Sequence, residues 1–330
     1  MDFIEKIKEK ARNNIRTIVL PEATDVRILR AVEMVYKENF AEIVLIGDRD
    51  EVLKIASDND IDISKAKIVN PKTSENYEKY VNEFFELRKH KGITLEQARE
   101  YLLDPVYFGV MMVKLNDADG LVSGAIHSTA DTLRPALQIL KTKPDTKLVS
   151  AFFIMCVPNC DFGANGTFAF GDCALIENPN SEELAEIAIQ TSESFKILVG
   201  EEPKPAMLSY STYGSAKSEL VDKVKNATEI VKQIKPDLQI DGELQLDAAI
   251  VKDVANLKAP GSEIAGNANV LIFPNIDAGN IGYKLVQRLG KAEAYGPLCQ
   301  GIAKPVNDLS RGCSAEDIAG VIAITSVQCN

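Results

Sequence analysis

The chain has 330 residues, which is long enough for two domains of ordinary size. Hydrophobic residues make up 45% of it and charged residues 26%, the balance of a globular protein, and the formal net charge is -11. An acidic chain of this kind repels nucleic acid and anionic membranes, so neither is an expected partner, and an anionic substrate would need a locally basic pocket.

Short apolar segments alternate with amphipathic helical segments along the chain. Apolar strands separated by helices indicate an α/β fold with parallel sheets covered by helices, in which ligands gather at the carboxyl ends of the strands. Strands are predicted at residues 17–20, 42–46, 120–122, 148–153, 205–209, 238–241 and 270–273. Helices are predicted at residues 25–36, 75–89, 95–102, 129–139, 181–198, 220–234, 279–289 and 315–326.

Two breaks in this pattern suggest a division into domains. Residues 141–147 are polar and contain Pro144, as a linker does, and the pair Gly296-Pro297 interrupts the chain again. We therefore expect a first α/β domain made of residues 1–147 and 297–330, and a second α/β domain made of residues 148–296. The last helix would return to pack on the first domain.

The first twelve residues are charged throughout, and no uncharged apolar run reaches the ~20 residues that span a bilayer. These features predict a cytoplasmic protein, in which the six cysteines are thiols. Cys156 and Cys160 are four residues apart, but no histidine or second close pair completes a ligand set, so we expect no metal site. No phosphate-binding glycine loop of the nucleotide-binding types is present.

The segment 120–134 has the pattern of a strand, a turn and a helix that begins near Ser128 or Thr129. The hydroxyl groups of these residues and the free amides of a first helical turn can bind an anion, and Arg134 could reach the same anion. Taken alone, the pattern favours an ordinary helix cap and a surface arginine over an anion site. His127, just before the helix, could be a general base or a packing and hydrogen-bonding residue.

The segment 304–318 contains the densest group of candidate catalytic residues. Arg311 can bind a phosphate through two parallel hydrogen bonds, and Ser310 can donate to an oxyanion. Ser314-x-x-Asp317 matches a capping box, whereas the alternative role for Asp317 is to accept a proton from a substrate. Cys313 could be a nucleophile, although no neighbouring histidine would activate it.

Two further positions are candidates for binding. Tyr213 lies in a cluster of hydroxyl groups, residues 210–215, that follows a predicted strand. Arg88 ends a predicted helix together with Lys89 and Lys91, where cations complement the helix dipole or could contact a distant phosphate of a large substrate.

Several of these segments together resemble the phosphate acetyltransferase (phosphotransacetylase) family. The resemblance covers nearly the whole chain in the same order and is looser only between residues 156 and 177. It rests on 19–30 (VLPEATDVRILR), 119–137 (DGLVSGAIHSTADTLRPAL), 209–216 (SYSTYGSA), 241–249 (DGELQLDAA), 273–286 (FPNIDAGNIGYKLV) and 296–314 (GPLCQGIAKPVNDLSRGCS).

The resemblance implies two α/β domains with a cleft between them, similar to isocitrate and isopropylmalate dehydrogenases, in a homodimer. It implies reversible acetyl transfer between coenzyme A and phosphate, a place in acetate metabolism, and no metal or nicotinamide cofactor. Coenzyme A, acetyl phosphate and phosphate would be substrates. Matching positions assign catalysis to Ser310, Arg311 and Asp317 and coenzyme A binding to Arg88 and Arg134, with Ser128, Thr129 and Tyr213 as weaker candidates for phosphate contacts.

Three alternatives stay open at this point. A phosphate butyryltransferase would use the same chemistry on a longer acyl group. A dehydrogenase of similar architecture would need a nicotinamide site and usually a metal held by aspartates, for which no suitable arrangement is visible. A non-catalytic domain that senses acyl-coenzyme A would bind without turnover.

Overall fold

The structure is a computed structural model that describes residues 2–144 and 146–329. The chain divides into two compact units, one formed by Met1–Asp145 with Ile302–Asn330 and the other by Thr146–Gly301. The domain boundaries expected at 147/148 and 296/297 remain a prediction. Residue 145, in the expected linker, lies outside the described residues. In the described part of the chain, no helix is both long and apolar enough to cross a membrane.

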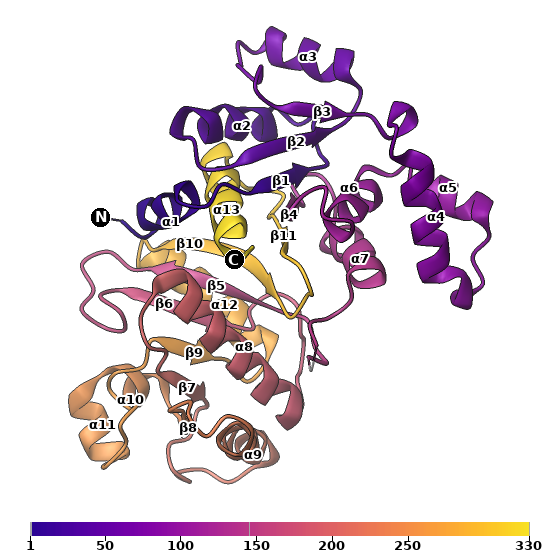
Figure 1. Ribbon diagram of the computed structural model, residues 1–330. Helices are drawn as coiled ribbons and strands as arrows, with labels where there is room; N and C mark the ends of the chain where they lie inside the picture. Colours follow the sequence, from indigo (N-terminus) through magenta and orange to yellow (C-terminus); the bar gives the residue numbers. More distant parts are fainter. Residues whose placement is uncertain (1, 145, 330) are drawn as a thin grey trace. The chain divides into compact units, whose positions relative to one another are not determined.

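The first unit is built on a parallel sheet with the strand order β11-β4-β1-β2-β3. Figure 1 shows α6 and α7 beside β4 and β11, and α13 beside α1 and α2. The elements of this unit are α1 (Phe3–Arg12), β1 (Thr17–Leu20), α2 (Val26–Glu38), β2 (Glu42–Ile46), α3 (Arg49–Asp58), β3 (Lys67–Val69), η1 (Pro71–Thr73), α4 (Tyr77–Arg88), η2 (Lys89–Lys91), α5 (Leu95–Tyr101), α6 (Pro105–Lys114), β4 (Gly120–Ser123), α7 (Thr129–Ile139), β11 (Val306–Asp308) and α13 (Ala315–Gln328).

Local sequence explains where several helices of this unit begin. The carboxylate of Asp25 accepts the Arg27 amide at the start of α2, and Asp104 caps α6, whose first residue is Pro105. Each cap pairs backbone donors that the helix itself leaves unpaired. The last helix, α13, is buried along most of its length and packs on α1, α2 and β4 of this unit.

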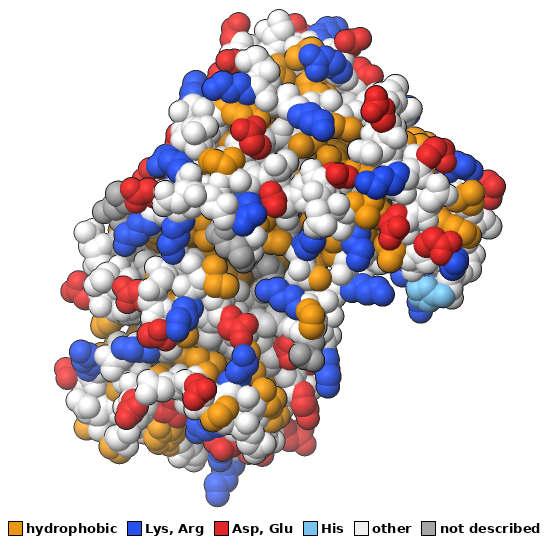
Figure 2. Space-filling model, viewed as in Figure 1, with side chains coloured by type: hydrophobic (Ala, Val, Ile, Leu, Met, Phe, Trp, Pro, Cys, Tyr) orange, Lys and Arg blue, Asp and Glu red, His pale blue; other side chains and the backbone are white. Residues whose placement is uncertain are grey.

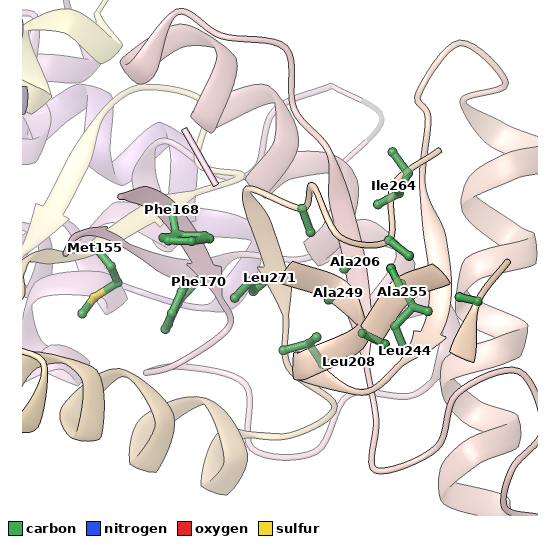
Figure 3. Packing of buried hydrophobic residues seen from close by; sticks show 14 of the residues in the cluster. Met155, Phe168, Phe170, Ala206, Leu208, Leu244, Ala249, Ala255, Ile264 and Leu271 are labelled. Carbon is green, nitrogen blue, oxygen red and sulfur yellow. The ribbon is translucent and has the colours of Figure 1, made fainter. Parts of the chain in front are cut away.

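The second unit is built on a six-stranded sheet with the order β10-β5-β6-β9-β7-β8. The aromatic residues Phe168 and Phe170 and the small residues around Ala206 form part of its buried core (Figure 3). Its elements are β5 (Ser150–Cys156), β6 (Thr167–Gly171), α8 (Ser181–Val199), β7 (Pro205–Leu208), α9 (Glu219–Ile234), β8 (Asp241–Leu244), α10 (Leu246–Ile250), α11 (Lys252–Lys258), β9 (Val270–Ile272), α12 (Ile276–Leu289) and β10 (Glu293–Gln300).

The expectation of purely parallel sheets is correct for the first unit and wrong for part of the second. There, β5 pairs antiparallel with both β6 and β10, while β6, β9, β7 and β8 pair in parallel. The short connection 157–166 joins β5 directly to β6, and a connection without a helix returns the chain antiparallel.

The strand expected at 238–241 is also wrong, because the strand in this region, β8, runs over Asp241–Leu244. The hydrophobic pattern misses it because its fully buried residue Glu243 is polar. Glu243 is accommodated there by hydrogen bonds from the Ser211 hydroxyl at 2.8 Å and the Gly214 amide at 2.8 Å.

Candidate active site

Three loops gather at one edge of the parallel sheet in the first unit. They follow the neighbouring strands β11, β4 and β1, whose carboxyl ends lie at the same edge because the strands are parallel. The loop after β1 carries Glu22, the loop after β4 runs from Gly124 to Ser128, and the loop after β11 carries Ser310 and Arg311. Ligands of parallel sheets bind at this edge, which makes the three loops the candidate active site.

The buried carboxylate of Glu22 organises the loop after β4. Its Oε2 accepts the amides of Gly124 at 3.0 Å and Ala125 at 2.9 Å, and its Oε1 accepts the amides of Ile126 and His127, each at 2.8 Å. His127 Nδ1 lies 2.8 Å from the same Oε1. Burial alone raises the pKa of Glu22, but these hydrogen bonds outweigh burial and leave its pKa below the ordinary value.

The guanidinium of Arg27 connects two of the three loops. Its Nη1 donates to the Arg311 carbonyl at 2.8 Å and to the Cys313 carbonyl at 3.0 Å, and its Nη2 donates to the Ala125 carbonyl at 2.9 Å. Nη2 also pairs with Asp25 at 2.7 Å. A single rigid side chain on α2 therefore fixes the loop after β11 against the loop after β4.

Asp308, the last residue of β11, connects the same two regions by a second contact. The Thr129 hydroxyl donates to its Oδ2 at 2.6 Å, whereas its buried Oδ1 has no hydrogen-bond partner among the described residues. Burial raises the pKa of Asp308 to about 6, against the lowering effect of the Thr129 hydroxyl. Gly124 is required beside it, since a Cβ there would lie 2.3 Å from Asp308 Oδ1.

The structure leaves the key groups of the loop after β11 available for a ligand. The Ser310 hydroxyl accepts the Gly312 amide at 3.3 Å and keeps its own proton for another acceptor. Arg311 is exposed, and its guanidinium forms no hydrogen bond or ion pair with any residue that the structure describes. An exposed hydroxyl beside an exposed guanidinium is suited to an acyl phosphate, which has one carbonyl oxygen and several anionic oxygens.

Asp317 forms the capping box that its spacing predicts. Its Oδ2 accepts the Ser314 amide at 2.9 Å, and its own amide donates to the Ser314 hydroxyl at 3.1 Å. The side chain is exposed, and the described residues provide no partner for its Oδ1. The cap therefore occupies one carboxylate oxygen and leaves the other free to accept a proton.

Cys313 is unsuited to nucleophilic catalysis. Its side chain is buried, and burial raises the pKa of the thiol to about 11 despite the nearby Arg27. The thiolate, which is the reactive form, is therefore scarce at neutral pH.

Arg88 and Arg134 lie on neighbouring helices of the first unit. Burial raises the pKa of Tyr107 on α6, and both guanidinium groups act electrostatically on that phenol in the opposite direction. Arg134 pairs with Asp131 at 3.3 Å, but both side chains are more than half exposed, so the pair holds the arginine weakly.

The hydroxyl groups of the three weaker candidates are already hydrogen-bonded to other residues of the chain. Ser128 is the N-cap of α7 and its hydroxyl donates to Asp131 at 2.7 Å, while the Thr129 hydroxyl donates to Asp308. Tyr213 belongs to the second unit, where its hydroxyl donates to Asp241 at 2.6 Å and burial raises its pKa to about 12. Contacts of Ser128 and Thr129 with a phosphate would therefore use their backbone amides.

Charge is mixed on the protein surface. Figure 2 shows basic and acidic side chains interspersed over the visible face.

Across residues 2–144 and 146–329, no three histidine, cysteine, aspartate or glutamate side chains gather as a metal site would require.

A sequence model of the phosphate acetyl/butaryl transferase family matches residues 2–326. The chain belongs to this family. Phosphate acetyltransferases from Acetivibrio thermocellus and Thermoanaerobacterium thermosaccharolyticum are each 61% identical to it over 328 residues, covering 99% of the chain and 98% and 99% of the relatives. A phosphotransacetylase structure from Streptococcus pyogenes superimposes with a TM-score of 0.93 at 47% identity, covering 99% of the chain and 98% of that structure.

The α/β architecture with two sheets is thus the fold of the phosphotransacetylases, as the sequence predicted. A protein assigned as a 4-hydroxythreonine-4-phosphate dehydrogenase from Salmonella typhimurium has a TM-score of 0.55 at 10% identity, covering 95% of the chain and 99% of that structure. At this identity the similarity shows that the two proteins share a fold, and nothing about a shared function.

Sequence reasoning missed three residues that build the site. Glu22 and Arg27 lie in the segment 19–30, which carries part of the family resemblance but received no assigned role, and Asp308 lies within the segment 304–318 but was not singled out there. Each is a charged residue within or directly after an apolar strand or helix, which is a usable signal for a hydrogen-bonding role inside the fold.

Proposed function

We propose that this protein is a phosphate acetyltransferase, which transfers an acetyl group reversibly between coenzyme A and inorganic phosphate. The observation that carries the proposal is the loop after β11, where Ser310 and Arg311 are exposed and Asp317 keeps one oxygen unpaired among the described residues. The identity of 61% to two phosphate acetyltransferases over nearly the full chain supports the acetyl group as the transferred acyl group.

In the direction that forms acetyl-coenzyme A, Asp317 accepts the proton of the coenzyme A thiol through its free oxygen. The thiolate attacks the acetyl carbonyl, the new carbon–sulfur bond forms, and the carbon–oxygen bond to phosphate breaks. Ser310 donates a hydrogen bond to the carbonyl oxygen as negative charge develops on it. Arg311 binds the phosphoryl oxygens and stabilises phosphate as it leaves. No acyl-enzyme forms in this scheme.

Arg88 and Arg134 are proposed to bind the phosphates of coenzyme A, and both guanidinium groups act electrostatically on the same phenol, that of Tyr107. Arg134 can exchange its exposed partner Asp131 for a substrate phosphate at small cost, because an exposed ion pair contributes less than about 1 kcal/mol. Coenzyme A acts here as a substrate, and the proposed chemistry requires no metal or nicotinamide. Ser128, Thr129 and Tyr213 are proposed to make further phosphate contacts.

The protein is also proposed to be a cytoplasmic homodimer. The six free cysteines support a reducing compartment, and the dimer follows from the family resemblance. Light scattering of the purified protein tests the dimer, which would be ruled out by a monomeric mass at working concentrations.

The experiment that tests the function is thioester formation from coenzyme A with acetyl, propionyl or butyryl phosphate, followed by absorbance. We expect acetyl phosphate to give the highest kcat/KM. A preference for butyryl phosphate would make the protein a phosphate butyryltransferase with the same mechanism. Binding of coenzyme A by folded protein without turnover of any acyl phosphate would instead support a sensing domain.

A further inference from the structure

The contact between Glu22 and the loop after β4 determines what this loop can offer a substrate. Four consecutive amides, from Gly124 to His127, would otherwise form a backbone anion site. Glu22 accepts all four of them, so a substrate anion cannot use them. Among these four residues, the hydrogen-bond donor that remains for an anion is the imidazole ring of His127.

Glu22 also fixes the orientation and the tautomer of this ring. An ionised carboxylate only accepts hydrogen bonds, so the 2.8 Å contact requires that His127 Nδ1 carries a proton. The other nitrogen, Nε2, has no hydrogen-bond partner among the described residues, and the side chain is 28% exposed. Glu22 thus holds the ring from the buried side and leaves Nε2 for solvent or a ligand.

His127 belongs to the same group of loops as the proposed catalytic residues. Arg27 binds the carbonyl of Ala125, two residues before His127, and the carbonyls of Arg311 and Cys313. His127 also directly precedes Ser128, the N-cap of α7.

We propose that His127 is a further catalytic residue of the phosphate acetyltransferase reaction, and that its imidazolium Nε2–H donates a hydrogen bond to the phosphoryl oxygens of acetyl phosphate or phosphate. This inference rests on the proposed function. In it, Arg311 and His127 bind the phosphoryl group together, and Glu22 is a positioning residue that acts through His127.

The charges around His127 support the cationic form. The hydrogen bond to Glu22 raises the pKa of His127, and this effect exceeds the lowering caused by burial. Because the raised pKa belongs to a base, the ring is charged below it and neutral above it, so phosphate affinity should fall as pH rises through that pKa. The ionisable groups that face the ring directly or through Glu22 are Glu22, Asp104 on the cap of α6, Asp131 on α7, Asp308 on β11, and Asp25 and the cation Arg27 at the start of α2.

The test combines NMR with kinetics, because the chain contains only two histidines, His90 and His127. His127→Asn keeps an amide donor for Glu22 but removes the Nε2–H group, and His90→Asn, in the exposed η2 turn, is the matched control. The two variants also assign the two imidazole resonances of the wild type. Adding inorganic phosphate should raise the NMR-measured pKa of His127 and leave that of His90 unchanged.

In the kinetic arm, His127→Asn should lower kcat/KM for acetyl phosphate by ~10-fold or more, the range of one hydrogen bond to a charged group. The rise of KM with pH expected for the wild type should be absent from this variant and present in His90→Asn.

Three outcomes would decide against parts of this account. If wild type is active and His127→Asn keeps the wild-type KM and its pH dependence, the role of His127 is refuted and the proposed function stands. If wild type is inactive, the proposed function fails. In that case a phosphate-induced pKa change at His127 would still support phosphate binding there, and its absence would refute that as well.

Discussion

Asp317 has two functions in this account, and two substitutions separate them. Asp317→Asn keeps an oxygen that can accept the Ser314 amide, so the cap survives, but the side chain can no longer act as a base. Ser314→Ala removes the hydroxyl that accepts the Asp317 amide at 3.1 Å and leaves the carboxylate in place. The first variant tests catalysis and the second tests stability.

The expected magnitudes differ clearly. Loss of a general base lowers kcat by about 100-fold to 10,000-fold, so Asp317→Asn should be nearly inactive. Loss of an N-cap costs about 1 kcal/mol, which lowers Tm by about 2–4 °C in a unit of this size, so Ser314→Ala should be measurably less stable. Asp317→Asn should lose less stability than Ser314→Ala, because it loses only a charge near the helix N-terminus.

Thioester formation and thermal unfolding, measured on both variants, check these expectations. The reasoning would be refuted if folded Asp317→Asn kept kcat within several-fold of wild type. Asp317 would then be a helix cap without a catalytic role. A large loss of kcat in Ser314→Ala with an unchanged Tm would also contradict the account, because it would give Ser314 a role in catalysis and none in stability.

Three further predictions concern the same loops. Cys313→Ala should keep substantial activity in the thioester assay, because the buried thiol is not the nucleophile; an inactive but folded variant would contradict direct transfer. Ser310→Ala should lower kcat by about 100-fold to 1,000-fold, as loss of an oxyanion donor does, with a smaller effect on KM, and a change confined to KM would assign Ser310 to binding alone. Asp308 has a pKa of about 6 in the folded protein against about 3.9 unfolded, so the folded state binds more protons between these values and stability falls as pH rises through this window. Asp308→Asn removes this loss of unfolding free energy, which amounts to roughly 3 kcal/mol. Denaturant unfolding at pH 4 and pH 7 should therefore show a free energy of unfolding that rises, relative to wild type, at the higher pH. A difference between variant and wild type that does not depend on pH would refute the raised pKa.

The sequence predicts well those features that depend on neighbouring residues. The capping box of Ser314 and Asp317 follows from a spacing of three residues, and β1 and β2 are apolar runs at the predicted positions. Arg311 and Ser310 were identified from the loop composition together with the family resemblance, and both are exposed as a binding role requires.

The contacts that assemble the site could not be predicted, because they join residues far apart in the chain. Glu22 binds amides about a hundred positions away, Thr129 binds Asp308 across 179 positions, and Arg27 binds the Arg311 carbonyl across 284 positions. Such contacts depend on the strand order β11-β4-β1, which the sequence pattern does not specify.

Buried polar residues explain two of the strands that the sequence pattern missed or misplaced, β8 and β11. β8 contains the buried Glu243, and β11 contains the buried Asn307 and Asp308. Hydrophobic periodicity overlooks such strands because their polar side chains are paired inside the protein, as Asn307 is with Thr325 at 2.8 Å.

The most direct test of direct transfer at the loop after β11 is an isotope-exchange measurement with wild-type protein. Labelled phosphate and acetyl phosphate are incubated with and without coenzyme A, and the label entering acetyl phosphate is measured. The account predicts exchange only when coenzyme A is present, because phosphate leaves only when the thiolate attacks. Rapid exchange without coenzyme A would demonstrate an acyl-enzyme and contradict the proposed roles of Ser310, Arg311 and Asp317.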